Sequence, residues 1–343
     1  MSPSLRTVTA DRGDAGVRLD RVLCRHLSDV PAATRTRVQA WIAGGCVTIN
    51  GRPVRRAAAR AALGDRVAVV IPDAPPRRAM RGEDVALDVL YEDDCCVAVA
   101  KPAGMVVHPT YRHPAGTLMN ALVGRARAWP AGERPSIVGR LDKLTSGVVL
   151  AAKTREAHAA LQRAAIEKMY LAVVYGRVPA ARGTIDLRLA LDSRDRRRVI
   201  ASAAAGAASR TLFERVARAA APRAGLALLR CTLETGRRHQ IRAHLQARGW
   251  PIVGDPVYGE PRWQLVTDPL LAAALRAFPR QALHAARLSF AHPITGSAIE
   301  IDAPLPADMS ALLETAHLRG DVRSTQREGF SRAISGVRLG WRA

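Results

Sequence analysis

The stretch of the chain best placed to do chemistry is the nonapeptide at residues 139–147. Its sequence is Gly-Arg-Leu-Asp-Lys-Leu-Thr-Ser-Gly, so Asp142 stands between the cations Arg140 and Lys143. The last three residues suit a turn, and the apolar run 148–152 then predicts a strand. A carboxylate flanked by cations at the mouth of a strand stays ionised near neutral pH. It could serve as a nucleophile or a base, or form a purely structural ion pair, and the stretch alone leaves both interpretations open.

The charge of the whole chain indicates a polyanionic partner. Its 343 residues include 52 basic and 30 acidic side chains, a net charge of +22. This excess favours nucleic acid, with an acidic membrane surface as the weaker choice. The sequence has no run of 18 apolar residues that could span a membrane, and residues 1–6 lack the apolar core of a signal peptide. We therefore expect a nucleic-acid-binding protein of the cytoplasm, and we also expect it to be a monomer.

Cysteines and short motifs give no sign of a metal or a cofactor. There is no glycine-rich dinucleotide fingerprint, no P-loop and no cluster with metal-ligand spacing. The cysteines are odd in number and scattered, which indicates reduced thiols. They are Cys24, Cys46, Cys95, Cys96 and Cys231.

Composition divides the chain into five segments. Two helix-like patterns and short strands fill the first 70 or so residues, a Pro- and Arg-rich stretch follows, and longer apolar strands come after it. We expect a flexible N-terminus at 1–14, a small domain at 15–72, a linker at 73–86, a larger domain at 87–306, and a C-terminal helix with a basic tail at 307–343.

The small domain is predicted to begin with two helices. Apolar residues recur at helical spacing in 18–27 and again in 34–43, and the second helix carries Arg35 and Arg37 on its first turn. A strand at 46–49 follows. Arginines at a helix N-terminus, together with its free N–H groups, are suited to binding phosphates.

The larger domain alternates strands and helices. We expect a buried strand at 95–100, a helix that Thr154 caps and that runs to 167, a strand at 168–176, and an exposed basic loop or hairpin at 192–211.

A later polar segment carries several candidate functional side chains. Thr235 could cap a helix there. In such a helix, His239 and Arg242 share one face, while Ile241 and Leu245 lie on another.

Ordered blocks of residues resemble two known families. The small domain resembles the S4 RNA-binding domain through Arg18-Leu19-Asp20, Thr34-Arg35-x-Arg37-Val38-Gln39, Gly45-x-Val47-x-Ile49-Asn50-Gly51 and Gly64-Asp65-x-Val67. The larger domain resembles the RluA-type pseudouridine synthases of the large-subunit ribosomal RNA type. The matching blocks are Lys101-Pro102-Ala103-Gly104, Arg140-Leu141-Asp142, Lys168-x-Tyr170, Thr235-Gly236-Arg237-x-His239-Gln240-Ile241-Arg242, and Gly254-Asp255 with Tyr258-Gly259.

This resemblance implies a fold, an activity and a partner. The fold is α+β: a small S4-like domain with a helical hairpin and strands, then a synthase domain on a mixed, mainly antiparallel sheet with flanking helices and a catalytic cleft. The activity is the isomerisation of uridine to pseudouridine in RNA, most plausibly 23S ribosomal RNA, without any cofactor.

The resemblance also assigns roles to individual residues. Asp142 is implied as the catalytic aspartate, Tyr170 as the active-site tyrosine and Arg242 as the partner of the aspartate. Arg140 would enter the RNA stack where the target base leaves. The other candidates for contact with the substrate RNA are Thr145, Lys168, Arg237, His239, Gln240, Arg35 and Arg37.

The chemistry explains why one carboxylate suffices. Isomerisation breaks a C–N glycosidic bond, turns the uracil and forms a C–C bond to the same sugar carbon, with no net redox change. A single aspartate can act as the nucleophile or base, whereas a paired-carboxylate glycosidase needs two. The sequence does not distinguish between three possible first steps: attack at the sugar, attack at the uracil ring, and a route through an eliminated sugar intermediate.

The chain departs from the family pattern at several positions, so the sequence does not identify the target RNA. The family usually has histidine where this chain has Gly139, Leu144 also departs from the commonest form, and Ala207 replaces a lysine in a basic loop. Two alternatives therefore stand beside a ribosomal substrate. One is a synthase of the same family that acts on transfer RNA, and the other is a catalytically silent RNA-binding or ribosome-assembly factor.

Overall fold

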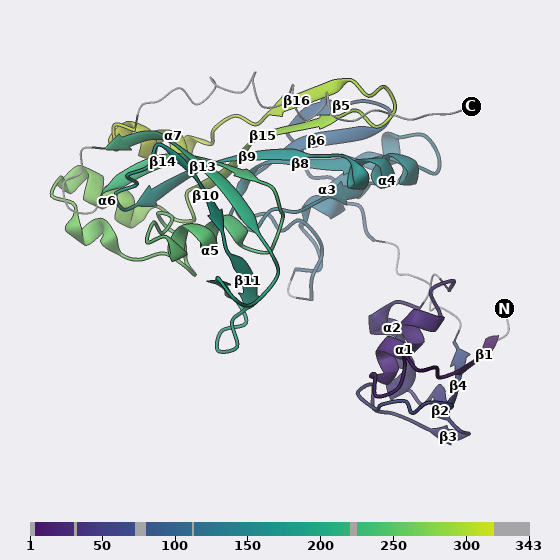
Figure 1. The fold of residues 1–343 in the computed structure, drawn as a ribbon. Coiled ribbons are helices and arrows are strands. Elements are labelled where there is room, and N and C mark those ends of the chain that lie inside the picture. The colour runs from purple at the N-terminus through teal and green to yellow at the C-terminus, as the bar shows by residue number, and fades with distance from the viewer. Residues whose placement is uncertain (1–3, 31–32, 73–79, 112, 220–224, 319–343) are drawn as a thin grey trace. The chain divides into compact units, whose positions relative to one another are not determined.

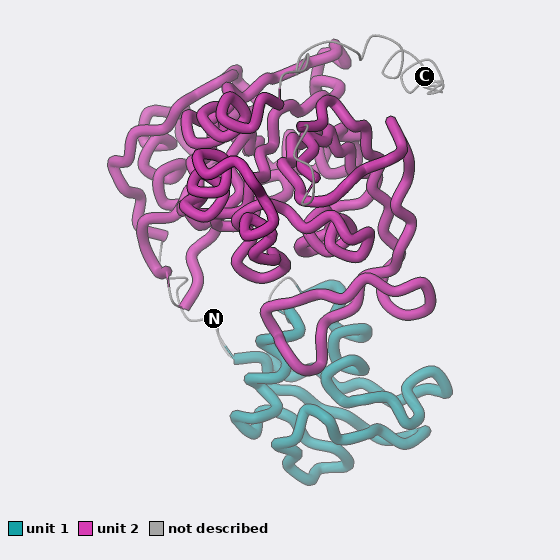
Figure 2. Tube along the Cα trace, turned by 90° about the vertical axis from the view of Figure 1, so that its left-hand side faces the viewer, with its two compact units in different colours: residues 1–79 teal, residues 80–343 magenta. Residues whose placement is uncertain are grey.

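The computed structural model describes residues 4–30, 33–72, 80–111, 113–219 and 225–318. The chain forms two compact units, residues 1–79 and residues 80–343 (Figure 2). Each unit is described by itself. No helix within the described ranges is long and apolar enough to cross a membrane.

The first unit packs two helices against a four-stranded sheet of order β1-β4-β2-β3. Leu19 and Leu23 of one helix and Val38 and Ile42 of the other are fully buried, as the helical spacing predicts. The elements are α1 (Leu19–His26), α2 (Arg35–Ala43), β1 (Ser4–Thr9), β2 (Val47–Ile49), β3 (Arg52–Pro53) and β4 (Arg66–Ile71).

The prediction of a flexible segment at 1–14 is wrong for residues 4–9. Ser4–Thr9 forms β1, which pairs antiparallel with β4 from Ser4 opposite Ile71 to Thr9 opposite Arg66. The strand is largely exposed and mostly polar, and its pairing depends on backbone hydrogen bonds that composition does not reveal. Residues 1–3 and the linker residues 73–79 lie outside the described part of the chain.

The second unit is built on one large mixed sheet of order β10-β13-β14-β9-β15-β8-β6-β5, with β16 paired to β15 and β7 to β8 (Figure 1). The β15–β8 pair is parallel and the other pairs are antiparallel. The central strands are β6 (Cys96–Lys101), β8 (Ser146–Ala152), β9 (Glu167–Tyr175), β14 (Leu226–Leu233) and β15 (Leu283–Ala291). The outer strands are β5 (Val89–Glu92), β7 (Ser136–Val138), β10 (Arg182–Asp186), β13 (Arg210–Ala219) and β16 (Ala298–Asp302). This is the mixed, mainly antiparallel sheet predicted from the sequence.

Apolar packing covers both faces of the sheet around β8. Val148 and Leu150 belong to the same core as Leu161, while the alternate residues Val149 and Ala151 belong to a second core. Because successive side chains of a strand point to opposite faces, an uninterrupted apolar strand serves both cores. The helices of this unit are α3 (Leu118–Arg125), α4 (Arg155–Arg163), α5 (Gln240–Ala247), α6 (Pro269–Ala277) and α7 (Ala307–Thr315).

One helix boundary differs from the sequence predictions, while the hairpin and the C-terminal helix agree with them. Thr154 caps α4 through the N–H of Ala157, as predicted, but this helix ends at Arg163 and not at residue 167. The basic segment 192–211 contains β12 (Val199–Ser202), which forms a hairpin with β11 (Arg188–Leu191). The expected C-terminal helix is α7, and residues 319–343 of the basic tail lie outside the described ranges.

Strand β15 lies between β8 and β9 and fixes the register of both. Ala285 of β15 is the partner both of Gly147 on β8 and of Tyr170 on β9. Gly147 has a φ of +120°, and a Cβ on it would lie 2.2 Å from the Ala285 carbonyl oxygen. A side chain therefore cannot fit where β8 meets β15.

We expect Gly147→Ala to lower the free energy of unfolding by roughly 3 kcal/mol, through both backbone strain and the clash with Ala285. Urea denaturation would measure it. Gly132→Ala is the matched control, because Gly132 has a φ of +95° but open space at its Cβ, so it should lose only about 1 kcal/mol. Equal losses in the two variants would contradict the clash.

Candidate active site

A polar cavity in the second unit has a volume of about 560 Å³. It opens where the loop between β7 and β8, strand β9 and the start of α5 meet. Among its described lining residues Asp142 is the single acid, and several cations surround it. The lining includes His108, Gly139, Arg140, Asp142, Thr145, Lys168, Tyr170, Arg237, Arg238, His239 and Arg242.

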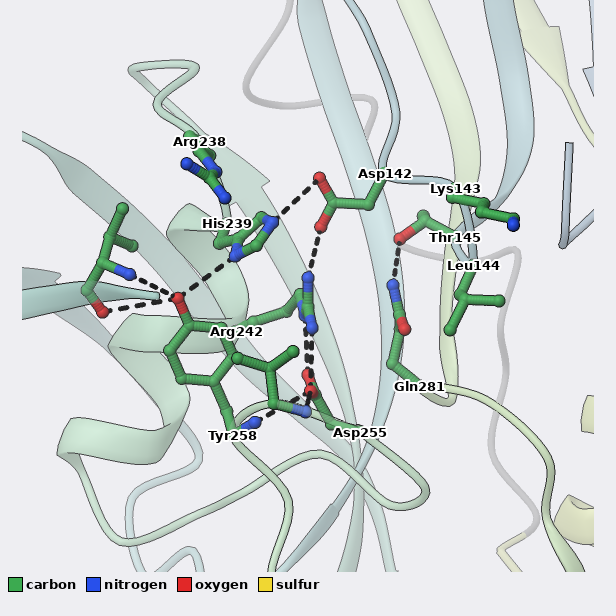
Figure 3. A network of polar contacts seen from close by, with 12 residues as sticks. Asp142, Lys143, Leu144, Thr145, Arg238, His239, Arg242, Asp255, Tyr258 and Gln281 are labelled. Atoms are coloured by element: carbon green, nitrogen blue, oxygen red, sulfur yellow. Dashed lines mark hydrogen bonds and ion pairs between the residues drawn. The ribbon is translucent and has the colours of Figure 1, made fainter. Parts of the chain in front are cut away.

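Arg242, which lines this cavity, lies between two aspartates (Figure 3). Arg242 Nη1 donates to Asp142 Oδ2 at 2.8 Å, while its Nε and Nη2 donate to the two oxygens of Asp255 at 2.6 and 2.8 Å. The side chains are 4% exposed for Arg242, 0% for Asp255 and 25% for Asp142. The fully buried Asp255 therefore fixes the guanidinium, which in turn fixes the one carboxylate that reaches solvent.

The charges of this triad stabilise one another. Burial by itself would lower the pKa of Arg242, but hydrogen bonds and charge from Asp255 and Asp142 raise it overall. Burial alone would raise the pKa of Asp255, but the hydrogen bond and charge of Arg242 and two backbone amides together outweigh it, so that pKa is lowered. Two backbone amides, of Val257 and Tyr258, also donate to Asp255 Oδ1 at 2.9 Å.

His239 lies on the other side of Asp142. Its backbone is left-handed, with a φ of +54°, immediately before α5 begins. Its Nε2 is 3.8 Å from Asp142 Oδ1, and its Nδ1 is 3.1 Å from the Tyr258 hydroxyl. Burial, which outweighs the nearby carboxylates, lowers the pKa of His239 to about 4. The imidazole is therefore neutral at physiological pH.

Tyr258 connects this network to the β11–β12 hairpin. Its hydroxyl accepts a hydrogen bond from the Val199 N–H at 2.8 Å, and its ring lies 5.1 Å from the Arg242 guanidinium carbon. The tyrosine therefore supports both the buried arginine and the histidine beside Asp142.

Hydrogen bonds from neighbouring residues fix the loop that carries Asp142. Lys101 is buried, and its ammonium donates to three carbonyl oxygens, including that of Lys143 at 3.2 Å. The Thr145 N–H donates to the Asp142 carbonyl at 3.1 Å, closing the turn, and Gln281 Nε2 donates to the Thr145 hydroxyl at 3.1 Å. These bonds give the aspartate a fixed backbone.

Tyr170 lies on β9 and lines the same cavity. Its side chain is 5% exposed. Burial, together with the negative charge of Asp142, raises its pKa well above the ordinary value, so the hydroxyl stays protonated at neutral pH.

Of the remaining candidates, three cations lie at the cavity and two arginines lie in the first unit. Arg140 and Arg237 are exposed at the cavity, and Lys168 is half-buried there. Arg35 and Arg37 belong to the first unit, where Arg35 Nε donates to the buried Asp20 at 3.2 Å.

Gln240 and Thr145 line the cavity, and both side chains are hydrogen-bonded within the protein. Gln240 is 2% exposed, and its amide donates to Arg210 O and Thr211 Oγ1. Its carbonyl accepts from Thr235 Oγ1 and the Arg237 N–H, so its bonding capacity is filled. Thr145 is also buried, and its hydroxyl is used in the turn described above.

The proposed Thr235 cap is also wrong. The helix α5 begins at Gln240, and Thr235 bonds to the Gln240 side chain and to the Arg210 N–H. Sequence reasoning missed the roles of Asp255 and Tyr258. A signal was available, because a buried arginine that must also serve Asp142 needs a second anion, and Asp255 follows in a Gly- and Pro-rich segment.

Comparison with known proteins identifies the family. A sequence model for RNA pseudouridylate synthases matches residues 96–247, and one for the S4 domain matches residues 17–67. The chain is 36% identical over 315 residues to the ribosomal large subunit pseudouridine synthase D of Neisseria meningitidis, across 91% of this chain and 82% of that protein. The chain belongs to the RNA pseudouridine synthase family.

Other relatives agree with this assignment. The synthase is 40% identical to the ribosomal large subunit pseudouridine synthase D of Xylella fastidiosa, across 92% of this chain and 93% of that protein. It is 37% identical to the uncharacterized RNA pseudouridine synthase YlyB of Bacillus subtilis, across 91% and 98%. The fold is similar to that of human RNA pseudouridylate synthase domain containing 1, with a TM-score of 0.53, 22% identity and coverage of 75% of this chain and 97% of that one.

We expect Asp255→Asn to lower the free energy of unfolding of the synthase by about 3 kcal/mol, because the buried Arg242 loses a charged partner. Chemical denaturation would measure the loss. Asp302→Asn is the control, since Asp302 is 58% exposed in its ion pair with Arg287 and should lose less than about 1 kcal/mol. A loss no larger than the control's would contradict a stabilising role for the buried pair.

Acid should destabilise the synthase between pH 6.5 and pH 4. The pKa of His239 is about 4 in the fold and near its ordinary value of 6.5 in the unfolded chain. In that interval the unfolded chain binds more protons, so the free energy of unfolding falls as the pH falls. Melting temperatures at intervals across this range should show a smaller decrease for His239→Asn than for wild type. The exposed His113→Asn should keep the full decrease, and identical profiles for all three proteins would refute the assignment.

Proposed function

We propose that this protein isomerises uridine in large-subunit ribosomal RNA, with Asp142 as its nucleophile or base. The observation that carries the proposal is the ion pair of Asp142 with Arg242 in the lining of the cavity. Asp142 is the one acid in that lining, and the tyrosine ring of β9 lines the same space. Relatives 36–40% identical over about nine-tenths of the chain have names that specify the large ribosomal subunit, which supports that substrate.

Each residue around Asp142 has a separate role in the proposed reaction. Arg242 orients the carboxylate and balances its charge in a partly dry site. Tyr170 packs against the uracil ring, and its protonated hydroxyl can give and receive a hydrogen bond at the sugar. Because the pKa of His239 is low, it lies beside Asp142 as a neutral group and does not compete with Arg242 as a second cation.

Each possible first step uses the same single carboxylate. Asp142 can attack the sugar carbon, attack the uracil ring, or take a proton from the sugar. In every case the glycosidic C–N bond breaks, the base turns, a C–C bond forms through C5 of the uracil, and the proton on C5 leaves. The net reaction is an isomerisation and needs no external group donor.

The cations at the cavity and in the S4 domain are proposed to bind the RNA. Extruding a base costs a few kcal/mol, and Arg140, which is exposed at the cavity, would fill the space that the base leaves. Arg237 would contact the flanking backbone, while Arg35 and Arg37 would bind phosphates at the start of α2. We further propose that the protein acts in the cytoplasm as a monomer.

Asp142→Asn should abolish isomerisation, with a rate at least roughly a thousandfold below wild type, while RNA binding stays within about tenfold. The assay measures tritium released from large-subunit ribosomal RNA labelled at uridine C5, beside a filter-binding measurement. The exposed Asp94→Asn should behave as wild type in both.

Mapping pseudouridine in RNA from cells that lack the protein identifies the substrate. Loss of a position in large-subunit ribosomal RNA supports the proposal. Loss of a position in transfer RNA instead, or binding without tritium release by the wild-type protein, would overturn it.

A further inference from the structure

Lys168 is a cation at the active-site cavity that has no anionic partner among the residues that the structure describes. It lies on β9 two residues before Tyr170, so both side chains point to the same face of the strand. It lines the cavity with Asp142, and it is half-buried. Burial lowers its pKa, and no nearby carboxylate offsets this. Within the described ranges its ammonium has neither a hydrogen-bond acceptor nor an ion-pair partner.

Gly139 provides the space that this ammonium occupies. Its backbone has a φ of +84°, and a Cβ on it would lie 2.4 Å from Lys168 Nζ. Any side chain at position 139 would therefore require the ammonium to move. The glycine that departs from the family's usual histidine and the partnerless lysine thus form one structural feature.

A partly desolvated ammonium without a partner is costly, so its ligand should carry a full negative charge. Uracil offers neutral carbonyl oxygens, and the ribose offers neutral hydroxyl groups. In a ribonucleotide only the phosphodiester is anionic, and lysine binds phosphate as a compact point charge. We propose that Lys168, in the space left by Gly139, binds a phosphodiester that adjoins the target uridine. This inference rests on the function proposed above.

The test uses short synthetic RNA hairpins centred on a uridine that the protein converts. In each hairpin one methylphosphonate, which is neutral, replaces a phosphate immediately 5′ of that uridine, immediately 3′ of it, or at a distant position. Binding is measured with the full-length Asp142→Asn protein, so that the RNA is not modified. We expect one of the two adjoining substitutions to weaken binding roughly tenfold, and the distant one to have a much smaller effect.

Variants of the protein complete the cycle. In Lys168→Met, binding to the unmodified hairpin should weaken roughly tenfold, and the same methylphosphonate should cause no further loss. Gly139→Ala keeps the charge of Lys168 but displaces its ammonium. RNA binding by this variant should therefore also be insensitive to that methylphosphonate. Arg163→Met, which removes an exposed cation on α4 outside the cavity lining, should retain the full sensitivity.

Two results would overturn the assignment. One is additive loss from Lys168→Met and the methylphosphonate. The other is unchanged binding of both adjoining methylphosphonates by protein with the native lysine, a measurement that does not depend on the folding of any variant. Failure of the proposed function is a separate outcome, because it is seen as absence of pseudouridine after incubation of wild-type protein with unmodified RNA.

Discussion

The active site depends on one guanidinium that holds two carboxylates from different parts of the chain. Arg242 comes from the first turn of α5, Asp142 from the loop before β8, and Asp255 from the segment after α5. Exposure falls from 25% at Asp142 to 4% at the arginine and 0% at Asp255. The buried half of the triad is therefore a neutral pair, and the remaining negative charge faces the cavity.

This arrangement reconciles two opposing requirements. A reactive carboxylate needs a partly dry site, yet an isolated buried carboxylate is costly. Asp255 offsets the cost of burying Arg242, so the arginine can orient Asp142 while its own charge stays paired. Cations at the cavity are left to attract a polyanion, which agrees with the net charge of +22 for the whole chain.

The sheet supplies the precision that this chemistry needs. Ala285 pairs with both Gly147 and Tyr170, so the strand after the Asp142 loop and the strand that bears the tyrosine share a fixed register. Lys101 and Gln281 hold the loop itself through backbone and hydroxyl groups. Rigid strands and a braced turn keep the side chains of the candidate site in place.

Sequence reasoning was most successful where function restricts residue type. The two-unit organisation, the mixed sheet and the grouping of Asp142 with Tyr170 and Arg242 could all be predicted from ordered motifs. It failed where the tertiary structure decides. Polar β1 is held by backbone pairing with β4, and the Thr235 cap was wrong because the Gln240 side chain organises that loop.

The partners of a buried group were the hardest part to predict. Asp255 was visible in the sequence as part of a motif, but its role depends on a contact with Arg242 that only the fold creates. Gln240 could not be distinguished from a surface residue for the same reason, since its four bonding partners come from two separate segments.

The most direct test of the central claim is a double-mutant cycle on single-turnover pseudouridine formation, with Asp142→Asn, Arg242→Lys and the double variant. If Arg242 acts through the carboxylate of Asp142, the double variant will be no slower than Asp142→Asn alone. Additive losses of activation free energy in proteins that remain folded would contradict the account, because they would mean that the arginine contributes independently of the aspartate.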